Sequence, residues 1–151
     1  MNEIVEKIAY IVNLLNTQYN LVYFDRGLLS DFNKNTQREY PLFYLLPITV
    51  FLSDINAGFS WVKTYNIKLY VLQNTGEQFG LDVNNILQSE RVEECYLLAE
   101  EFIKRYNTTF NNDILRRVTI EEFRGLADFT NYHICGVYLE LNIDSENLID
   151  C

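Results

Sequence analysis

The order of its patterned segments constrains the fold of this chain more than any single motif does. A segment with apolar residues at helical spacing comes first and three strand-like segments follow. A second long helical segment then precedes two more strand-like ones. This order, α-β-β-β-α-β-β, predicts an α+β fold with a mainly antiparallel sheet packed by two helices. The 151 residues fit a single domain, residues 1–151, whose last residues from about 145 are expected to form a loose tail.

Two amphipathic stripes predict the helices. Asn2 can cap the first helix, which is expected to end at about Thr17, and the second is expected within Val83 to Tyr106. The residues expected to face the core recur at three- and four-residue intervals. They are Ile4, Val5, Ile8, Ile11, Val12 and Leu15 in the first helix, and Val92, Cys95, Ala99, Phe102 and Tyr106 in the second.

Two strands and a long loop are expected before the clearest strand of the chain. The first strand is short, Leu21 to Phe24, and a polar loop from Gly27 to Glu39 follows it. The second strand runs from Tyr40 to Leu52, and Pro47, which has no backbone N–H, is expected to bend or interrupt it. A turn over residues 53–60 should join this strand to the next as an antiparallel hairpin.

Alternation is clearest in the third strand, Trp61 to Leu72. The side chains expected to face the core are Trp61, Tyr65, Ile67, Leu69 and Val71, and those on the other, largely wet face are Thr64, Asn66, Lys68 and Tyr70. A fourth strand is expected over Ile114 to Phe123. A last strand, Cys135 to Ile143, has one apolar face.

The charge balance excludes several classes of partner. The formal net charge is -9 and the pI is about 4.5, which argues against sequence-specific capture of nucleic acid and against anionic membranes, because both depend on Lys and Arg. The chain has neither a membrane-spanning apolar stretch nor the features of a signal peptide, so we expect residence in a cytoplasm. Three cysteines without C-x-x-C spacing do not support a disulfide framework or a zinc site.

The sequence contains no recognisable catalytic constellation. His133 is the only histidine, so a Ser-His-Asp or Cys-His arrangement would have to use this one residue. A metal site with several histidines is excluded. The acidic pairs Glu93-Glu94, Glu100-Glu101 and Glu121-Glu122 diverge in direction on a helix or strand and are typical of solvated surface. The glycines form no phosphate-binding motif. We therefore expect no enzymatic activity, no cofactor and no metal.

Five phenylalanines lie in polar loop segments, where exposure would leave apolar surface in water unless something covers it. They are Phe32, Phe59, Phe79, Phe110 and Phe129. Some are expected to pack onto the chain's own core, and the remainder are candidates for a partner surface, because aromatic residues are enriched at interface centres. Arg116 and Arg117 lie in an expected strand, where only one of the two can face a given partner, and are assigned to an edge or interface.

The element order resembles that of the tail-terminator and neck-ring (head-tail connector) proteins of tailed bacteriophages. The segments that carry the resemblance are Glu3 to Gln18, Tyr40 to Leu52, Trp61 to Leu72, the helix ending at Tyr106, and Gly136 to Leu141. It implies a non-enzymatic virion subunit, assembled in the host bacterial cytoplasm, which forms a homo-oligomeric ring through which DNA passes. The implied partners are copies of the chain and neighbouring portal, adaptor or tail proteins, and no catalytic residues carry over.

The same order also resembles the cytoplasmic chaperones of type III secretion, small acidic homodimers that wrap an extended effector segment. A third class, a small hydrolase or transferase, stays open because missing motifs do not exclude a novel site. The stretches Gly27 to Glu39 and Asn74 to Asp82 are long for a compact chaperone and suit contacts with several neighbours. The phage interpretation is therefore preferred.

Overall fold

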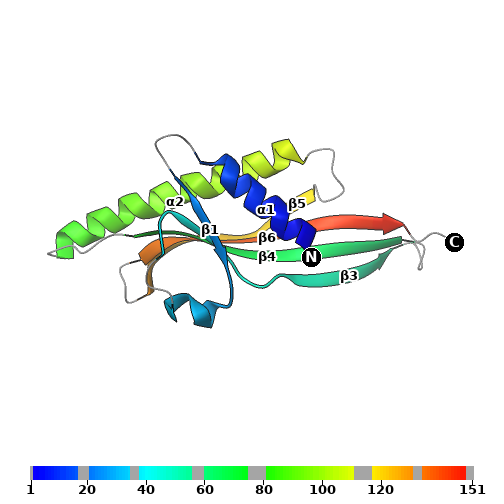
Figure 1. Ribbon diagram of the computed structural model, residues 1–151, viewed down its shortest axis with the longest axis horizontal. Helices are drawn as coiled ribbons and strands as arrows, with labels where there is room; N and C mark the ends of the chain where they lie inside the picture. The colour runs from blue at the N-terminus through cyan, green and yellow to red at the C-terminus, as the bar shows by residue number, and fades with distance from the viewer. Residues whose placement is uncertain are drawn as a thin grey trace.

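The computed structural model describes residues 2–16, 21–34, 38–55, 60–74, 81–110, 117–130 and 134–148. These residues contain two α-helices, one 3-10 helix (η1) and six strands (Figure 1). In chain order they are α1 (Asn2–Leu14), β1 (Tyr23–Arg26), η1 (Leu29–Lys34), β2 (Leu42–Leu45), β3 (Thr49–Ile55), β4 (Ser60–Asn74), α2 (Leu81–Thr109), β5 (Arg117–Thr130) and β6 (Ile134–Leu148). The predicted α+β class and element order are confirmed. The one difference in order is that the expected second strand, Tyr40 to Leu52, forms two strands, β2 and β3.

The strands form one sheet around the long antiparallel pair of β4 and β6, which runs from Ser60 opposite Leu148 to Asn74 opposite Ile134. On the other side of β6 lies β5, also antiparallel. The remaining side of β4 is shared, because β2 pairs with residues 69–72 and β3 pairs with residues 60–66. β1 pairs with β2 and is parallel to it. The expected mainly antiparallel sheet is confirmed, with this one parallel pairing.

Pro47 divides the expected strand Tyr40–Leu52 into β2 and β3. The backbone N–H of Leu46 still donates to the carbonyl oxygen of Lys68 at 3.0 Å, and the next residue, Pro47, has no N–H with which to continue the ladder. The expected interruption is confirmed at this residue. After it, β3 and β4 form the predicted antiparallel hairpin.

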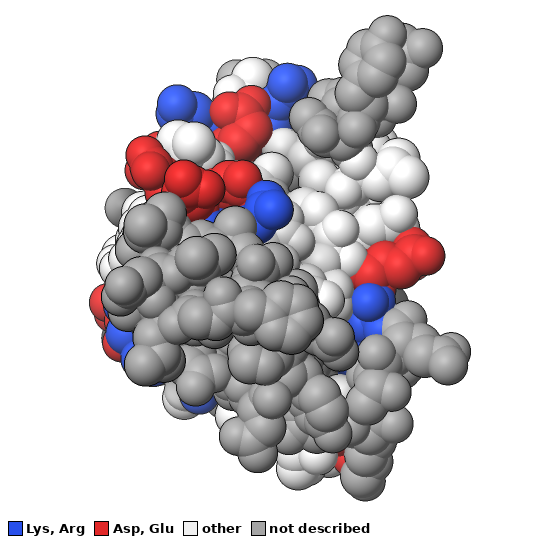
Figure 2. All heavy atoms as spheres, turned by 90° about the vertical axis from the view of Figure 1, so that its left-hand side faces the viewer, with Lys and Arg blue, Asp and Glu red and all other residues white. Residues whose placement is uncertain are grey.

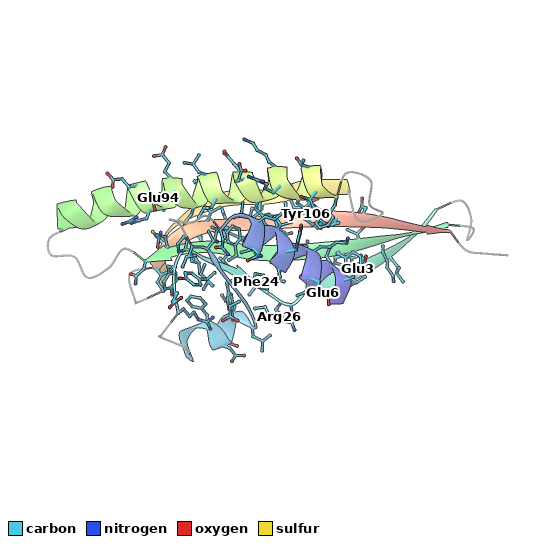
Figure 3. All side chains as sticks on the ribbon, turned by 45° about the horizontal axis from the view of Figure 1, so that its top comes forward. Glu3, Glu6, Phe24, Arg26, Glu94 and Tyr106 are labelled. Carbon is cyan, nitrogen blue, oxygen red and sulfur yellow. The ribbon has the colours of Figure 1, made fainter. Side chains whose placement is uncertain are left out.

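Both helices lie on the same face of the sheet (Figure 1). The main core lies between them and the two long strands, and includes Ile4, Ile8, Ile11, Cys95, Ala99, Phe102, Ile67, Leu69, Val71, Val137 and Leu139. Figure 3 shows Tyr106 beneath α2 on the side of α1, whereas Glu3 and Glu6 stand on α1. The predicted stripes of both helices therefore face the core, where burying each large aliphatic side chain stabilises the fold by about 1.5–3 kcal/mol.

The opposite face of the sheet is covered at one end. A second buried cluster there consists of Phe32, Leu42, Tyr44, Tyr70, Leu72, Ile134 and Tyr138. Arg38 fixes η1 against the sheet, because its guanidinium forms an ion pair with Asp25 and lies 4.7 Å above the ring centre of Phe32 and 4.9 Å from that of Tyr44. The expectation that this face is largely wet is wrong at this end, because the segment after β1 folds back over it.

Several elements differ from their expected bounds. α1 ends at Leu14, before the expected Thr17, and α2 is longer than expected at both ends. β6 continues to Leu148, where a loose tail from about 145 was expected, because the start of β4 pairs with residues 145–148. β5 reaches Thr130, beyond the expected end at Phe123. Long mutual pairing therefore extends these strands past the region of clear alternation.

Candidate functional site

Two of the predicted interface phenylalanines pack within the chain itself. Phe32 is only 3% exposed and meets the ring of Tyr44 edge-on, with 5.0 Å between the ring centres. Phe110 is half-buried after the end of α2, where its ring centre lies 4.9 Å from that of Tyr106 and 4.3 Å from the ammonium nitrogen of Lys7. These rings help to hold η1 and the end of α2 in place. Phe32 is therefore covered within the chain, whereas Phe110 keeps part of its surface exposed.

The other predicted interface residues are placed only in part. Arg117 and Phe129 lie in β5, whose backbone is described, whereas their side chains lie outside the described set. Arg117 opens an edge strand, as expected for it. Phe59, Phe79 and Arg116 lie outside the described residues, as does His133.

The exposed apolar surface comes from different residues, which sequence reasoning did not single out. Eight large side chains are 47–60% exposed: Tyr10, Leu21, Leu28, Leu29, Phe51, Leu52, Leu97 and Ile120. Several of them sit inside helices or strands, where the apolar pattern suggests core. The signal that could have identified Phe51 and Leu52 is their place after Pro47, which disrupts the expected strand.

The sheet ends in strands whose outer sides have no partner among the described strands. β3 pairs only with β4 in this set, and β5 pairs only with β6. β1, which is four residues long, covers the edge beside β2 and does not pair with β3 (Figure 1). An edge strand presents unpaired N–H and C=O groups to any chain that lies beside it. β3 and β5 are therefore edge strands of the described sheet.

A hydrogen-bonded polar row crosses the sheet face opposite the helices. Asn66 Nδ2 on β4 donates to Asn142 Oδ1 on β6 at 2.9 Å and to Glu140 Oε2 at 3.2 Å. Asn142 Nδ2 donates in turn to Glu121 Oε1 on β5 at 2.9 Å. These bonds hold the two carboxylates in fixed positions on the surface.

Glu140 receives a second donor from its own strand. The Tyr138 hydroxyl donates to Glu140 Oε1 at 2.7 Å, and this bond, with the one from Asn66, lowers the pKa of the Glu140 carboxyl. Burial, and then the hydrogen bond to Glu140, raise the pKa of Tyr138. A carboxyl whose pKa is lowered stays ionised at neutral pH and is a poor general acid, so this row presents fixed negative charge.

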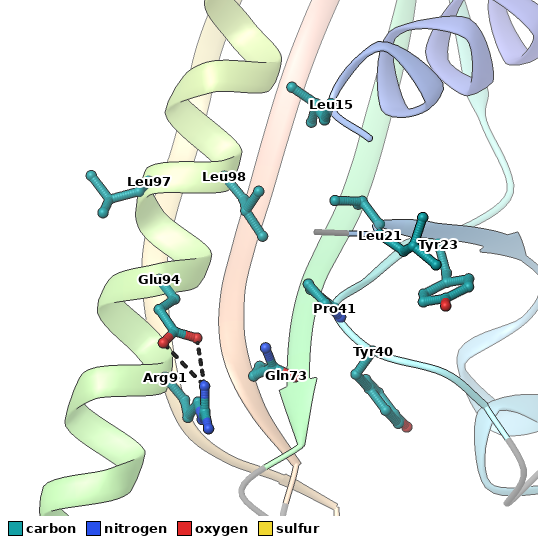
Figure 4. Close-up of a pocket in the computed structure, with 11 residues that line it drawn as sticks. Leu15, Leu21, Tyr23, Tyr40, Pro41, Gln73, Arg91, Glu94, Leu97 and Leu98 are labelled. Carbon is teal, nitrogen blue, oxygen red and sulfur yellow. Dashed lines mark hydrogen bonds and ion pairs between the residues drawn. The ribbon is translucent and has the colours of Figure 1, made fainter. Parts of the chain in front are cut away.

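A groove of about 790 Å³ lies between α2 and the segment that carries β1 and Pro41 (Figure 4). Its lining is mostly apolar and includes Leu15, Leu21, Pro41 and Leu98. Leu97 and Leu98 of α2 both contribute to the lining, and Figure 4 shows Leu98 on the side of α2 that faces Leu15 and the strands.

One ion pair lies at the α2 side of this groove. Arg91 Nη1 donates to both carboxylate oxygens of Glu94 at 3.0 Å. Figure 2 shows one end of the molecule, where charged residues gather at the upper left and a smaller charged group lies at the right, with uncharged surface between them. The groove could hold an apolar segment, and the pairing of Arg91 with Glu94 leaves little net charge to select a ligand.

Within the described residues there is no group of three or more His, Cys, Asp and Glu side chains that could hold a metal ion. Neither described helix has an apolar stretch long enough to cross a bilayer. Cys95 is buried on the core-facing side of α2, and burial raises the pKa of its thiol to about 12. A thiol with this pKa is protonated at neutral pH and is a weak nucleophile.

Compared with known proteins, the chain matches no protein-family model and no curated protein sequence.

Proposed function

We propose that this chain is a non-enzymatic structural subunit that assembles with copies of itself into a ring in the tail or head-tail connector of a bacteriophage particle. The observation that carries the proposal is the distribution of the exposed apolar side chains. These side chains come from separate elements. They are Tyr10 on α1, Leu21 before β1, Leu28 just before η1, Leu29 at the start of η1, Phe51 and Leu52 on β3, Leu97 on α2 and Ile120 on β5. A surface with several separate apolar patches suits a subunit that meets several neighbours.

The charge of the chain is compatible with a ring around DNA. The net charge is -9, and the polar row holds Glu121 and Glu140 on an exposed sheet face. Such a surface repels phosphates within a Debye length of about 8 Å at physiological salt, so DNA could pass without being captured. The acidic surface permits this role but does not select it.

The groove favours a second candidate, a chaperone that binds an extended effector segment. Its mostly apolar lining, to which Arg91, Glu94, Leu97 and Leu98 of α2 contribute, suits an extended peptide segment. The two proposals differ in symmetry, because a ring needs head-to-tail contacts between unlike faces, whereas a chaperone dimer uses one two-fold interface.

The particle itself provides the test. Mass spectrometry and antibody labelling of purified virions from the phage that encodes the chain should detect it in multiple copies at the tail or the head-tail junction. Native mass spectrometry of the purified chain should show either monomer or a closed ring. Virions that lack the chain, or a stable two-fold dimer that binds a secreted effector, would overturn the proposal and favour the chaperone.

A further inference from the structure

The directions of the strands make the two open edges complementary. β3, β4, β6 and β5 are neighbours in this order, and each is antiparallel to the next. Because there are four of them, β3 and β5 run in opposite directions. A second copy in the same orientation therefore presents its β5 antiparallel to the β3 of the first.

We propose that β3 of one copy pairs antiparallel with the first four residues of β5 of the next copy, so that the sheet continues from subunit to subunit. This inference rests on the proposed function and identifies the two surfaces that would form the ring. The pairs are Val50 with Ile120, Phe51 with Thr119, Leu52 with Val118, and Ser53 with Arg117.

Side-chain alternation supports this register. Val50 pairs with Tyr65, and Val118 pairs with Ile143, both on the helix side of the sheet. Leu52 and Ile120 share that side, because residues two apart along a regular strand face the same way. Residues directly opposite in an antiparallel pair also share a face, so the proposed register sets apolar against apolar. It would cover Leu52 and Ile120, now 60% and 49% exposed.

An irregularity in β5 sets the length of the contact. The register between β5 and β6 shifts between Ile120 and Glu122, which leaves Glu121 without a direct partner on β6. A bulge of this kind bends the strand and ends regular pairing on its outer side. The regular segment before it is Arg117 to Ile120, which matches four residues of β3.

Two-fold arrangements fit the edges less well. Pairing β5 with β5 over its regular segment would cover Ile120 but leave all of β3 open. Pairing β3 with β3 would cover Phe51 and Leu52 but leave all of β5 open. A head-to-tail contact covers both edges in every copy.

Disulfide trapping tests this contact in the purified full-length chain. Directly opposite residues have Cα atoms about 4.5–5.5 Å apart, within reach of a disulfide. Phe51 and Thr119 are both exposed, so cysteine at either position should leave the fold intact. In a Cys151→Ser background, Phe51→Cys, Thr119→Cys and the double variant are oxidised and compared on non-reducing gels. A disulfide keeps two copies joined even after a brief contact, so the test does not need a stable ring.

The head-to-tail contact predicts a distinct pattern for each protein. The double variant should shift to a ladder of dimers, trimers and larger species that reductant returns to monomer. Each single variant should stay monomeric, and a mixture of the two should stop at dimers. Dimers of Phe51→Cys alone, dimers of Thr119→Cys alone, or no ladder from the double variant would each overturn the proposed contact.

The outcome separates this inference from the proposed function. A ring in native mass spectrometry or in virions, without the ladder, would leave the function standing and refute the β3–β5 contact. A ladder from a chain that virions lack would establish the contact and refute the virion assignment. Circular dichroism of each variant shows whether the fold is retained.

Discussion

The two ends of the β4–β6 pair are built from the same strands but have different surroundings. At residues 67–72 of β4, helices cover one face and the second buried cluster covers the other. At residues 60–66, β3 lies beside β4 with Phe51 and Leu52 exposed, and the polar row begins at Asn66. The closed end supplies the stability of the fold, whereas the open end supplies surface. A substitution should therefore have very different effects at the two ends.

The largest expected effect is that of Leu69→Asp at the closed end. Leu69 lies on β4, and its side chain is fully buried under the helices. An aspartate there would be an unpaired charge in the core. We expect a loss of at least about 4 kcal/mol in the free energy of unfolding, which is a large part of the roughly 5–15 kcal/mol that stabilises a typical domain. Urea unfolding followed by circular dichroism measures it.

The matched control is Phe51→Asp at the open end, where the side chain is already 55% exposed. In the monomer this change should cost no more than about 1 kcal/mol, because it creates no buried charge. Similar losses for Leu69→Asp and Phe51→Asp would contradict the division into a closed and an open end.

The next effect in size concerns Gly136, which lies in β6 at the closed end. A Cβ atom at this position would collide with the backbone carbonyl oxygen of Val71 and lie 2.9 Å from Leu72 Cα. Backbone of a paired strand cannot move aside cheaply, so Gly136→Ala should cost about 3 kcal/mol.

Gly125→Ala on the edge strand β5 provides the comparison. Its Cβ would meet side-chain atoms of Val92 and Tyr96 at 3.1–3.3 Å, which can shift by a few tenths of an ångström. We expect a change of less than about 1 kcal/mol. Thermal unfolding of both variants measures the difference, and equal midpoints would argue against the close approach of β4 and β6 at Gly136.

The sequence predicts the closed end better than the open end. Alternation identifies Ile67, Leu69 and Val71 as core, and the helical stripes identify Ile8 and Phe102, because burial on one face leaves a period in the sequence. The division at Pro47 follows from its missing N–H. These features depend on the local sequence pattern, and the folded chain shows them where the pattern predicts them.

The remaining features depend on contacts that no local pattern records. Tyr70 and Tyr138 lie on the face expected to be wet, and they are buried because η1 and Arg38 return over them. The parallel pairing of β1 with β2 is likewise a choice of tertiary neighbour. Phe32, a predicted partner residue, is part of this cover.

The candidate contact surface was missed for a related reason. Phe51, Leu52 and Ile120 have the composition of buried strand residues, yet exposure at a sheet edge depends on whether another strand lies beyond it. Of the five phenylalanines in polar loops, Phe32 and Phe110, the two whose side chains are described, pack within the chain, as was expected for some of the five.

A smaller effect is expected from acid at the polar row, near the boundary between the two ends. The pKa of Glu140 is lowered in the folded state, so its carboxylate stabilises the fold at neutral pH, and this contribution is lost as the pH falls below the ordinary glutamate value of about 4.3. The free energy of unfolding of the wild type should therefore fall more steeply between about pH 5 and pH 3 than that of Glu140→Gln.

The source of this pKa shift can be tested separately. Tyr138→Phe removes the hydroxyl that donates to Glu140 Oε1, so the pKa of Glu140 should rise towards its ordinary value. Carboxyl-carbon NMR titration measures it directly. An unchanged Glu140 pKa in Tyr138→Phe would show that the hydrogen bond is not its main cause.

The smallest perturbation compares thiol reactivity at the two ends without disturbing the fold. Burial raises the pKa of Cys95 to about 12, so at pH 8 its thiolate fraction should be about a thousandfold below that of an exposed thiol, whose pKa is about 8.5. Alkylation of Phe51→Cys in the folded chain, followed by peptide mass spectrometry, compares Cys95 with the introduced thiol in one molecule. The thiol at position 51 should react at least about a thousandfold faster, and urea should remove most of the difference. Comparable native rates would mean that Cys95 reaches solvent, and that the end of the sheet beneath α2 opens more readily than its packing implies.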